Sequence, residues 1–234
     1  MIEIDSLAKS YKKQPALNNV SLNIDKPGIY SVLGPNGSGK TTLIKTILGI
    51  VHKDSGSVKI NGTDTKPGIQ YLRNVTYQPQ AARFPENLAM GQVISMIEDI
   101  RGEKGNYEEI MELFGLNNHR KKSIKSLSGG SRQKFNILLA IMFDSPVIIF
   151  DEPTTGLDPL AIIKFKKILN ERKEMGKYIL LTSHDIHFVE SITDFIIFLL
   201  EGEVRFFGTT DEINARAGRN TLEESIAVLL GGGK

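Results

Sequence analysis

The sequence is most constrained at Gly34–Thr41, which reads Gly-Pro-Asn-Gly-Ser-Gly-Lys-Thr and fits the pattern G-x-x-x-x-G-K-[ST]. A short apolar run, Ile29–Leu33, precedes this stretch, and Thr42–Leu48 carries apolar residues at helical spacing. We therefore predict a phosphate-binding loop between a strand and a helix. In such a loop, successive backbone N–H groups and the N-terminus of the following helix form a concave site for anions.

The residue types in this loop predict the contacts that a nucleotide would make. The ammonium group of Lys40 is expected to reach the β- and γ-phosphates, and the Thr41 hydroxyl is placed to bind Mg²⁺. Glycines allow the tight backbone that brings the amides close to the phosphates. The nucleotide-binding residues predicted in this segment are Gly34, Pro35, Asn36, Gly37, Ser38, Gly39, Lys40, Thr41 and Thr42.

The composition is that of a soluble globular protein, with 234 residues, 40% of them hydrophobic and 24% charged. A formal net charge of +2 gives no general reason to expect nucleic-acid binding, and the absence of cysteine excludes disulfides and cysteine-ligated metals. Met1–Asp5 lacks the basic residues of a signal peptide. The longest apolar runs, Ile137–Phe143 and Phe195–Leu200, are far shorter than the roughly 20 residues that span a bilayer. Any membrane role is therefore expected to act through a partner.

Alternating apolar positions predict short strands on both sides of the loop. Met1–Ile24 is typical of two antiparallel strands joined by a polar connection at residues 10–15. Asn74–Tyr77 is predicted to be a further strand, which Pro79 ends. The side chain of Gln80 is then left at the carboxyl end of a strand, where ligands commonly bind in α/β sheets.

A helical insertion and a second anion site are predicted in the middle of the chain. Residues 81–126 carry apolar positions at helical spacing, separated by polar and glycine-containing connections. Ser128 is a natural N-cap for the helix that follows, and it leaves the N–H groups of Gly129 and Gly130 at the positive helix end. These amides could bind an anion, or Ser128 could serve only as a cap.

Two strands are predicted to end in acidic and imidazole side chains. Pro146–Phe150 is wholly apolar, as in the centre of a parallel sheet, and runs directly into Asp151 and Glu152. Lys177–Thr182 is a second buried strand, followed closely by His184. Because the carboxyl ends of parallel strands share one edge of a sheet, we expect these side chains beside the phosphate loop. The alternative, solvated acids at a surface strand end, is disfavoured by that loop.

Taken in order, these motifs resemble the ATP-binding cassette ATPase of ABC transporters over nearly the whole chain. Ser131 departs from the family pattern, which often has glutamine there. The resemblance identifies Gly34–Thr41 as Walker A, Gln80 as the Q-loop glutamine, Leu127–Ser131 as the signature motif, Asp151-Glu152 as Walker B with the catalytic acid, Gly156–Asp158 as the D-loop, His184 as the switch histidine and Tyr11 as the adenine-stacking aromatic residue.

The resemblance implies an α/β fold with a P-loop NTPase (RecA-like) core, an antiparallel β subdomain and an inserted helical subdomain. The chain would form a single domain over residues 1–234. Residues 1–80 and 127–207 would make the nucleotide-binding core with its β subdomain, residues 81–126 the helical signature subdomain, and residues 208–234 a C-terminal helical tail. Apolar positions in that tail could pack on the domain or on a second copy.

The resemblance also implies ATP and Mg²⁺ as cofactors, with ATP hydrolysis as the reaction. Glu152, His184, Lys40 and Gln80 would be the catalytic residues: Glu152 would polarise the attacking water and His184 would contact the γ-phosphate. Thr41, Gln80 and Asp151 would hold the metal. The remaining nucleotide contacts would come from Tyr11, Ser128, Gly129, Gly130 and Asp158.

In this family the signature helix of one copy closes the nucleotide site of the other, so a homodimer is implied. A separate transmembrane permease subunit would receive the motion through residues 81–126. The chain would therefore act at the cytoplasmic face of the cell membrane, as a peripheral protein. No nucleic-acid partner is expected.

The cargo is addressed only by a weaker resemblance. Gln80–Asp99 and Leu200–Phe207 look similar to the ATPase of the copper-linked maturation system for nitrous oxide reductase, which would imply copper or sulfur handling with a periplasmic accessory protein. A generic drug or lipid exporter ATPase is the alternative. A soluble ABC-type ATPase acting on nucleic acid or the ribosome is disfavoured by the near-neutral charge and the single cassette.

Overall fold

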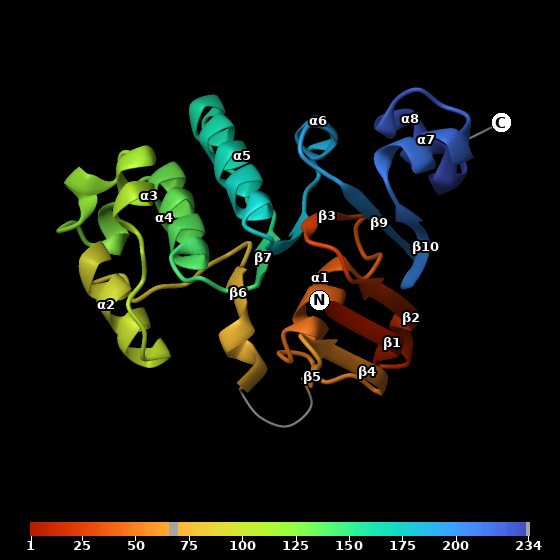
Figure 1. The fold of residues 1–234 in the computed structure, drawn as a ribbon, viewed down its shortest axis with the longest axis horizontal. Helices are drawn as coiled ribbons and strands as arrows, with labels where there is room; N and C mark the ends of the chain where they lie inside the picture. Colours follow the sequence, from red (N-terminus) through yellow and green to blue (C-terminus); the bar gives the residue numbers. More distant parts are fainter. Residues whose placement is uncertain (66–69, 233–234) are drawn as a thin grey trace.

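The computed structural model describes residues 1–65 and 70–232, and its two β-sheets lie side by side with helices around them (Figure 1). The larger sheet has the strand order β10-β9-β3-β8-β7-β6, in which neighbouring strands are parallel except for the β9–β10 hairpin. Two of its central strands, β3 and β7, are buried along their whole length, as their mostly apolar sequences predict. The strands are β3 (Gly28–Leu33), β6 (Val75–Gln78), β7 (Val147–Asp151), β8 (Tyr178–Thr182), β9 (Phe195–Leu200) and β10 (Glu203–Gly208).

The smaller sheet is antiparallel, with the order β2-β1-β4-β5. The two N-terminal strands predicted from Met1–Ile24 are confirmed, but their connection is shorter than the predicted residues 10–15. Only Lys12 and Lys13 lie between the strands, and both have positive φ (46° and 70°), as in the tight two-residue turns that match the twist of a hairpin. The strands are β1 (Ile2–Tyr11), β2 (Gln14–Ile24), β4 (Ser55–Ile60) and β5 (Thr63–Asp64).

Helix α1 (Lys40–Ile47) joins the two sheets into one body. Its buried residues Leu43, Ile44 and Ile47 belong to a core that contains residues of both sheets, among them Ile2 and Ile149. Because this helix begins at the end of the phosphate loop, its packing fixes the loop against the rest of the molecule.

Helices α2, α3 and α4 gather at the end of the molecule opposite the small sheet (Figure 1). Their apolar faces belong to a second large core: Val93 of α2 and Met111 of α3 are buried there together with Phe135 of α4. Gly102 ends α2 in the left-handed conformation that a glycine C-cap favours. The helices between β5 and β7 along the chain are η1 (Gln70–Asn74), α2 (Met90–Arg101), α3 (Glu108–Leu113), η2 (Asn117–His119), η3 (Ile124–Ser126) and α4 (Gly129–Ile141).

The remaining helices complete the fold after β7. Leu222 is fully buried, and Ile226 and Leu229 pack against the same core as α4. The apolar face of the C-terminal stretch therefore packs on its own domain, which decides between the two alternatives left open by the sequence. The elements are α5 (Pro159–Glu174), α6 (Ile186–Glu190), α7 (Thr210–Ala217), α8 (Leu222–Ala227) and η4 (Val228–Gly232).

Candidate active site

The phosphate loop lies between β3 and α1, as predicted, and two of its glycines are required by close backbone contacts. Gly34 has a φ of 146°, and a Cβ atom there would collide with the carbonyl oxygen of Leu199. Gly39, the N-cap of α1, has a φ of 106°, and a Cβ atom there would collide with the carbonyl oxygen of Ala16. A side chain at either position would displace backbone, so the loop conformation depends on these glycines.

The side chain of Lys40 folds back over the loop. Its Nζ donates hydrogen bonds to the carbonyl oxygens of Gly34 at 2.6 Å and Pro35 at 3.0 Å. Burial lowers the pKa of Lys40, and the nearby carboxyl groups of Glu152 and Asp151 act in the opposite direction. An anion in the loop would offer the ammonium group a stronger partner than these neutral carbonyls.

A cavity of about 290 Å³ opens above the loop and gathers residues from distant parts of the sequence. It brings together predicted adenine, phosphate, metal and catalytic residues in a single site. Its lining residues are Tyr11, Ala16, Asn36, Gly37, Gly39, Lys40, Thr41, Thr42, Gln80, Asp151, Glu152, Thr182 and His184.

Asp151 and Glu152 lie at the carboxyl end of β7 and are both buried. The hydroxyl of Thr182, on the neighbouring strand, donates to Asp151 Oδ1 at 2.7 Å and accepts a hydrogen bond from the Glu152 N–H at 3.0 Å. Glu152 also has a positive φ of 51°, a conformation that residues other than glycine rarely adopt. Such backbone strain persists where surrounding contacts hold it, and it is common at active sites.

The side chain of Glu152 is paired with the predicted switch histidine. The backbone N–H of His184 donates to Glu152 Oε2 at 3.2 Å, and His184 Nε2 lies 3.2 Å from Glu152 Oε1. Burial raises the pKa of Glu152, while the neighbouring His184 lowers it to a smaller extent. A carboxyl group with a raised pKa is a better proton acceptor than an ordinary glutamate, as general-base chemistry requires.

The two glutamines near the end of β6, Gln78 and Gln80, have different environments. Gln78 is fully buried, and its Nε2 donates to the Pro79 carbonyl oxygen at 2.7 Å. Gln80 instead lines the cavity, and so does the exposed ring of Tyr11 at the end of β1. The positions of both predicted residues therefore suit contact with a bound nucleotide.

Seven predicted nucleotide-binding residues are not among the lining residues: Gly34, Pro35 and Ser38 belong to the phosphate loop itself, whereas Ser128, Gly129, Gly130 and Asp158 lie on other elements. Ser128 caps α4, its Oγ accepting a hydrogen bond from the Ser131 N–H at 3.2 Å. Asp158 caps α5 in the same way and pairs with Lys134 at 2.6 Å, a contact that lowers the pKa of the Asp158 carboxyl. Within one chain, these capping residues and the glycines at positions 129 and 130 are not brought to the phosphate loop.

Sequence reasoning missed two residues that contact Asp151. The apolar pattern indicates only that Thr182 ends a strand, directly before Ser183 and His184. The hydroxyl of Tyr77 lies 3.5 Å from Asp151 Oδ2; burial, and next the charge of Asp151, raises the pKa of Tyr77. The only signal in the sequence was their place at the ends of strands that flank β7.

The oxygen donors around the loop fit Mg²⁺. Thr41, Gln80 and Asp151 all line the cavity, and Mg²⁺ prefers oxygen ligands, which it combines with water and substrate phosphates. In the part of the chain that the structure describes, no three His, Asp, Glu or Cys side chains form a metal-binding group. The residues present are thus suited to a metal held jointly with a nucleotide rather than in a protein cage.

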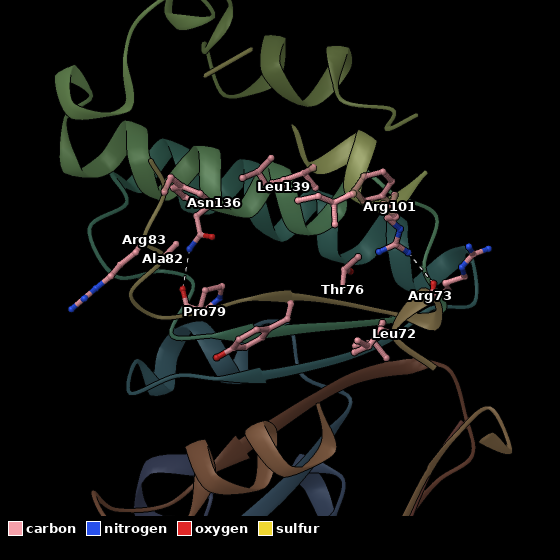
Figure 2. Close-up of a pocket in the computed structure, with 15 residues that line it drawn as sticks. Leu72, Arg73, Thr76, Pro79, Ala82, Arg83, Arg101, Asn136 and Leu139 are labelled. Atoms are coloured by element: carbon pink, nitrogen blue, oxygen red, sulfur yellow. Dashed lines mark hydrogen bonds between the residues drawn. The ribbon is translucent and has the colours of Figure 1, made fainter. Parts of the chain in front are cut away.

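A larger lateral groove, of about 960 Å³, lies between β6 and helices α2 and α4 (Figure 2). Figure 2 shows the Arg101 guanidinium pointing to Arg73, to whose carbonyl oxygen it donates a hydrogen bond at 2.8 Å. The same guanidinium donates to Ser145 Oγ at 2.6 Å. The buried hydroxyl of Thr76 lines the groove and has no hydrogen-bond partner among the described residues. The groove combines apolar walls (Leu72, Phe84, Ile97, Ile100, Leu139 and Phe143) with Arg73, Arg83 and Arg101, and none of its lining residues is acidic.

Comparison with known sequences identifies the family. The sequence profile described as ABC transporter matches residues 17–155. The lantibiotic transport ATP-binding protein SrtF of Streptococcus pyogenes is 32% identical over 206 residues, which are 87% of this chain and 89% of SrtF. The lipopolysaccharide export system ATP-binding protein LptB of Escherichia coli is 30% identical over 217 residues, 89% of this chain and 90% of LptB.

Solved structures agree with this assignment. An ATP-binding subunit of an ABC transporter superposes with a TM-score of 0.93 at 29% identity, covering 98% of this chain and 99% of that one. A dimeric ATP-binding cassette with bound ADP and Pi, from a post-hydrolysis state, superposes with a TM-score of 0.76 at 25% identity over 89% of this chain and 98% of its own. The predicted fold class is confirmed: a P-loop α/β core, an antiparallel β sheet and an inserted group of helices. The chain belongs to the ABC transporter family, as one of its ATP-hydrolysing subunits.

Proposed function

We propose that this chain hydrolyses ATP to drive a transporter whose membrane-spanning part is a separate polypeptide. The observation that carries the proposal is the single cavity in which the phosphate loop, Lys40, Asp151, Glu152 and His184 meet. Within the described residues no helix is both long and apolar enough to cross a bilayer. A membrane partner would therefore supply the spanning segments, and the chain would work at the cytoplasmic face.

In the proposed reaction, ATP enters with its phosphates against the loop amides and its adenine on Tyr11. Lys40 exchanges the carbonyl oxygens of the loop for phosphate oxygens. Thr41, Gln80 and Asp151 would hold Mg²⁺, which when bound neutralises charge on the phosphates.

Glu152 would orient and polarise the attacking water, and His184 would turn from Glu152 towards the γ-phosphate. The contact between these two side chains is consistent with such a rearrangement, because both residues line the cavity. Catalysis would then rest mainly on positioning and on electrostatic stabilisation of the transferred phosphoryl group.

A second copy of the chain would complete each site. Two solved cassettes similar to this chain are described as dimeric, at 25% and 26% identity. Ser128, Gly129, Gly130 and Asp158 lie outside the cavity of their own chain and are free to face the nucleotide of a partner. An isologous dimer with two shared sites would use all four residues.

The lateral groove is the proposed binding place for the membrane partner. Its apolar walls and basic rim favour a short amphipathic segment that carries an acidic side chain. The chain between Pro79 and Ala82 connects the two sites: both of these residues line the groove, whereas Gln80 between them lines the nucleotide cavity. A shift of Gln80 on binding or releasing the metal ion would therefore act directly on the wall of the groove.

For the cargo we retain the proposal of copper or sulfur handling with a periplasmic accessory protein, which rests on the similarity of residues 80–99 and 200–207 to the copper-linked ATPase. The relatives SrtF and LptB are named for lantibiotic transport and lipopolysaccharide export, which supports an exporter-type partner as the second candidate. The cargo is expected to contact the membrane partner rather than this chain. The genes beside the coding sequence would distinguish these candidates.

The first test is capture of the partner from membranes. Glu152→Gln protein, loaded with ATP and Mg²⁺, would be mixed with detergent-solubilised membranes, and bound chains identified by mass spectrometry. We expect a polytopic membrane protein with wild-type and Glu152→Gln protein, and much less of it with Arg83→Glu in the groove. Lys59→Glu, an exposed change on the small sheet, is the matched control. Recovery of ribosomes or nucleic acid instead would overturn the proposal in favour of a soluble ATPase.

A further inference from the structure

We propose that Thr182 is a positioning residue for hydrolysis, whose hydroxyl fixes the metal-side carboxylate and the catalytic acid relative to each other. The inference rests on the proposed ATPase chemistry. One oxygen atom makes both contacts: Thr182 Oγ1 lies 2.7 Å from Asp151 Oδ1 and 3.0 Å from the backbone nitrogen of Glu152. Thr182 is only 1% exposed, so both contacts are largely shielded from bulk solvent.

The direction of these two hydrogen bonds is fixed by the chemistry of a hydroxyl. The single Thr182 proton goes to the Asp151 carboxylate, because the other neighbour is a backbone N–H that can only donate. A lone pair of the same oxygen then accepts from Glu152. A side chain without a hydroxyl leaves a buried carboxylate oxygen and a buried N–H without partners.

The pairing register of β7 and β8 determines the position of the Thr182 hydroxyl. Strands β7 and β8 are parallel, and Asp151 pairs directly with Thr182 at their carboxyl ends. The hydroxyl therefore lies beside Asp151 and at the first residue beyond the strand, where the backbone turns out of the sheet at Glu152.

The hydrogen bond between the Glu152 N–H and Thr182 Oγ1 matters because the Glu152 backbone is strained. Glu152 has a φ of 51°, an unfavourable conformation that neighbouring contacts must hold. Its backbone N–H is held by Thr182, and its carboxylate is held by the backbone N–H of His184 at 3.2 Å. The contact with Thr182 does not involve His184 itself, so Thr182 would still hold the Glu152 backbone if His184 moved towards a phosphate.

The Thr182 hydroxyl also gives the two oxygen atoms of the Asp151 carboxylate different roles. Oδ1 accepts the hydrogen bond from Thr182 at 2.7 Å, whereas Oδ2 has the Tyr77 hydroxyl at the longer distance of 3.5 Å. Oδ2 is thus the oxygen available to a metal ion or to water bound to it. Removing the Thr182 hydroxyl would let the carboxylate rotate and would weaken the response to Mg²⁺.

The test compares Thr182→Val, which keeps the shape and removes the hydroxyl, with Thr182→Ser, which keeps the hydroxyl and removes a methyl group. For Thr182→Val we expect kcat to fall by about tenfold or more, because two buried polar groups lose their partner, with KM for ATP changed by less than about threefold. The Mg²⁺ concentration for half-maximal activity should rise. Thr182→Ser should stay close to wild type in kcat, in KM for ATP and in the Mg²⁺ concentration for half-maximal activity.

A binding measurement gives a readout independent of turnover. Affinity for a fluorescent ATP analogue, measured with Mg²⁺ and with a chelator, should show a smaller gain from Mg²⁺ in Thr182→Val than in wild type, and equal affinity without metal. If Thr182→Val does not fold, Thr182→Ser and Thr182→Ala provide the same comparison, since both lack the methyl group.

Two results would overturn the inference: wild-type kcat and Mg²⁺ response in Thr182→Val, or equal losses in the variants with and without the hydroxyl. Absence of ATP hydrolysis by the wild-type chain with its membrane partner would instead reject the proposed function itself. The two failures are therefore distinguishable.

Discussion

At Glu152 both the backbone and the side chain are held in states that cost stability. The backbone has a positive φ of 51°, and burial raises the pKa of the carboxyl group. Natural proteins accept such local costs mainly where function requires the geometry. Glu152 lines the nucleotide cavity, so the strained backbone and the buried carboxyl group lie where the proposed hydrolysis takes place.

The raised pKa gives a prediction about stability. Because the folded-state pKa lies above the unfolded one, the stability linked to protonated Glu152 is lost as pH rises through the folded-state pKa. Glu152→Gln carries no such charge. We expect the nucleotide-free variant to unfold at a higher temperature than wild type at neutral pH, with a difference that shrinks towards acidic pH.

Scanning calorimetry across this pH range would measure the difference. The exposed Glu174→Gln at the end of α5 is the control and should give no pH-dependent difference. A Glu152→Gln variant less stable than wild type at neutral pH would show that the contacts with His184 outweigh the burial cost.

Lys40 provides the second prediction at this scale. Its ammonium group is held at the phosphate loop by two carbonyl oxygens, and phosphates would take their place. Lys40→Ala should reduce ATP affinity by about tenfold or more, since hydrogen bonds to charged groups contribute roughly 1.5–3 kcal/mol. Titration calorimetry would measure the affinity, with Lys59→Ala on the small sheet as the control. Unchanged binding would contradict the assignment of the phosphate loop.

At the scale of elements, helix N-termini carry much of the site. Helix α1 begins at the phosphate loop, α4 at Ser128 and α5 at Asp158, and the last two helices are capped by the side chains of those residues. A helix start offers unpaired N–H groups and partial positive charge to an anion. Only the start of α1 faces its own cavity, so the other two are available to a second chain.

The cap at Ser128 allows stability and function to be separated. Ser128→Asp keeps a good N-cap and should leave the unfolding temperature close to that of wild type. Its added negative charge would face the γ-phosphate of the partner's nucleotide, so the ATP-bound dimer should be lost. Ser128→Ala should instead cost about 1 kcal/mol of stability through loss of the cap. Size-exclusion chromatography with ATP would measure the dimer, and a stable Ser128→Asp dimer would refute the proposed role of α4.

Most elements were predictable because their signals are local. Mostly apolar runs predicted the central strands, and the glycine-lysine pattern predicted the start of α1. The contacts of Thr182 were not predictable, because they depend on the register between β7 and β8, which joins residues 31 positions apart. The lateral groove was also missed, since its walls come from β6, α2 and α4 and no single stretch of sequence marks it.

At the scale of the whole molecule, the four signature and D-loop residues lie outside the cavity of their own chain, so they could contact a nucleotide only if a second chain faces them. In the proposed isologous dimer, each site would combine the phosphate loop of one copy with α4 of the other. Lys40→Ala would impair the phosphate loop, and Ser128→Asp would impair the start of α4. Neither variant alone should form an ATP-dependent dimer or hydrolyse ATP.

Mixing these two variants tests the composite site directly. In the mixed dimer one site carries both changes, and the other combines the intact phosphate loop of Ser128→Asp with the intact α4 of Lys40→Ala. We therefore expect mixing to restore an ATP-dependent dimer of two 25.9 kDa chains, with no more than about half the activity of the wild-type dimer. Phosphate release would measure the activity and light scattering the dimer. The control is a mixture of Lys40→Ala and Glu152→Gln, which both change the phosphate-loop side of the site. This mixture should stay inactive. Failure of the first mixture to recover activity would mean that each chain builds its site alone.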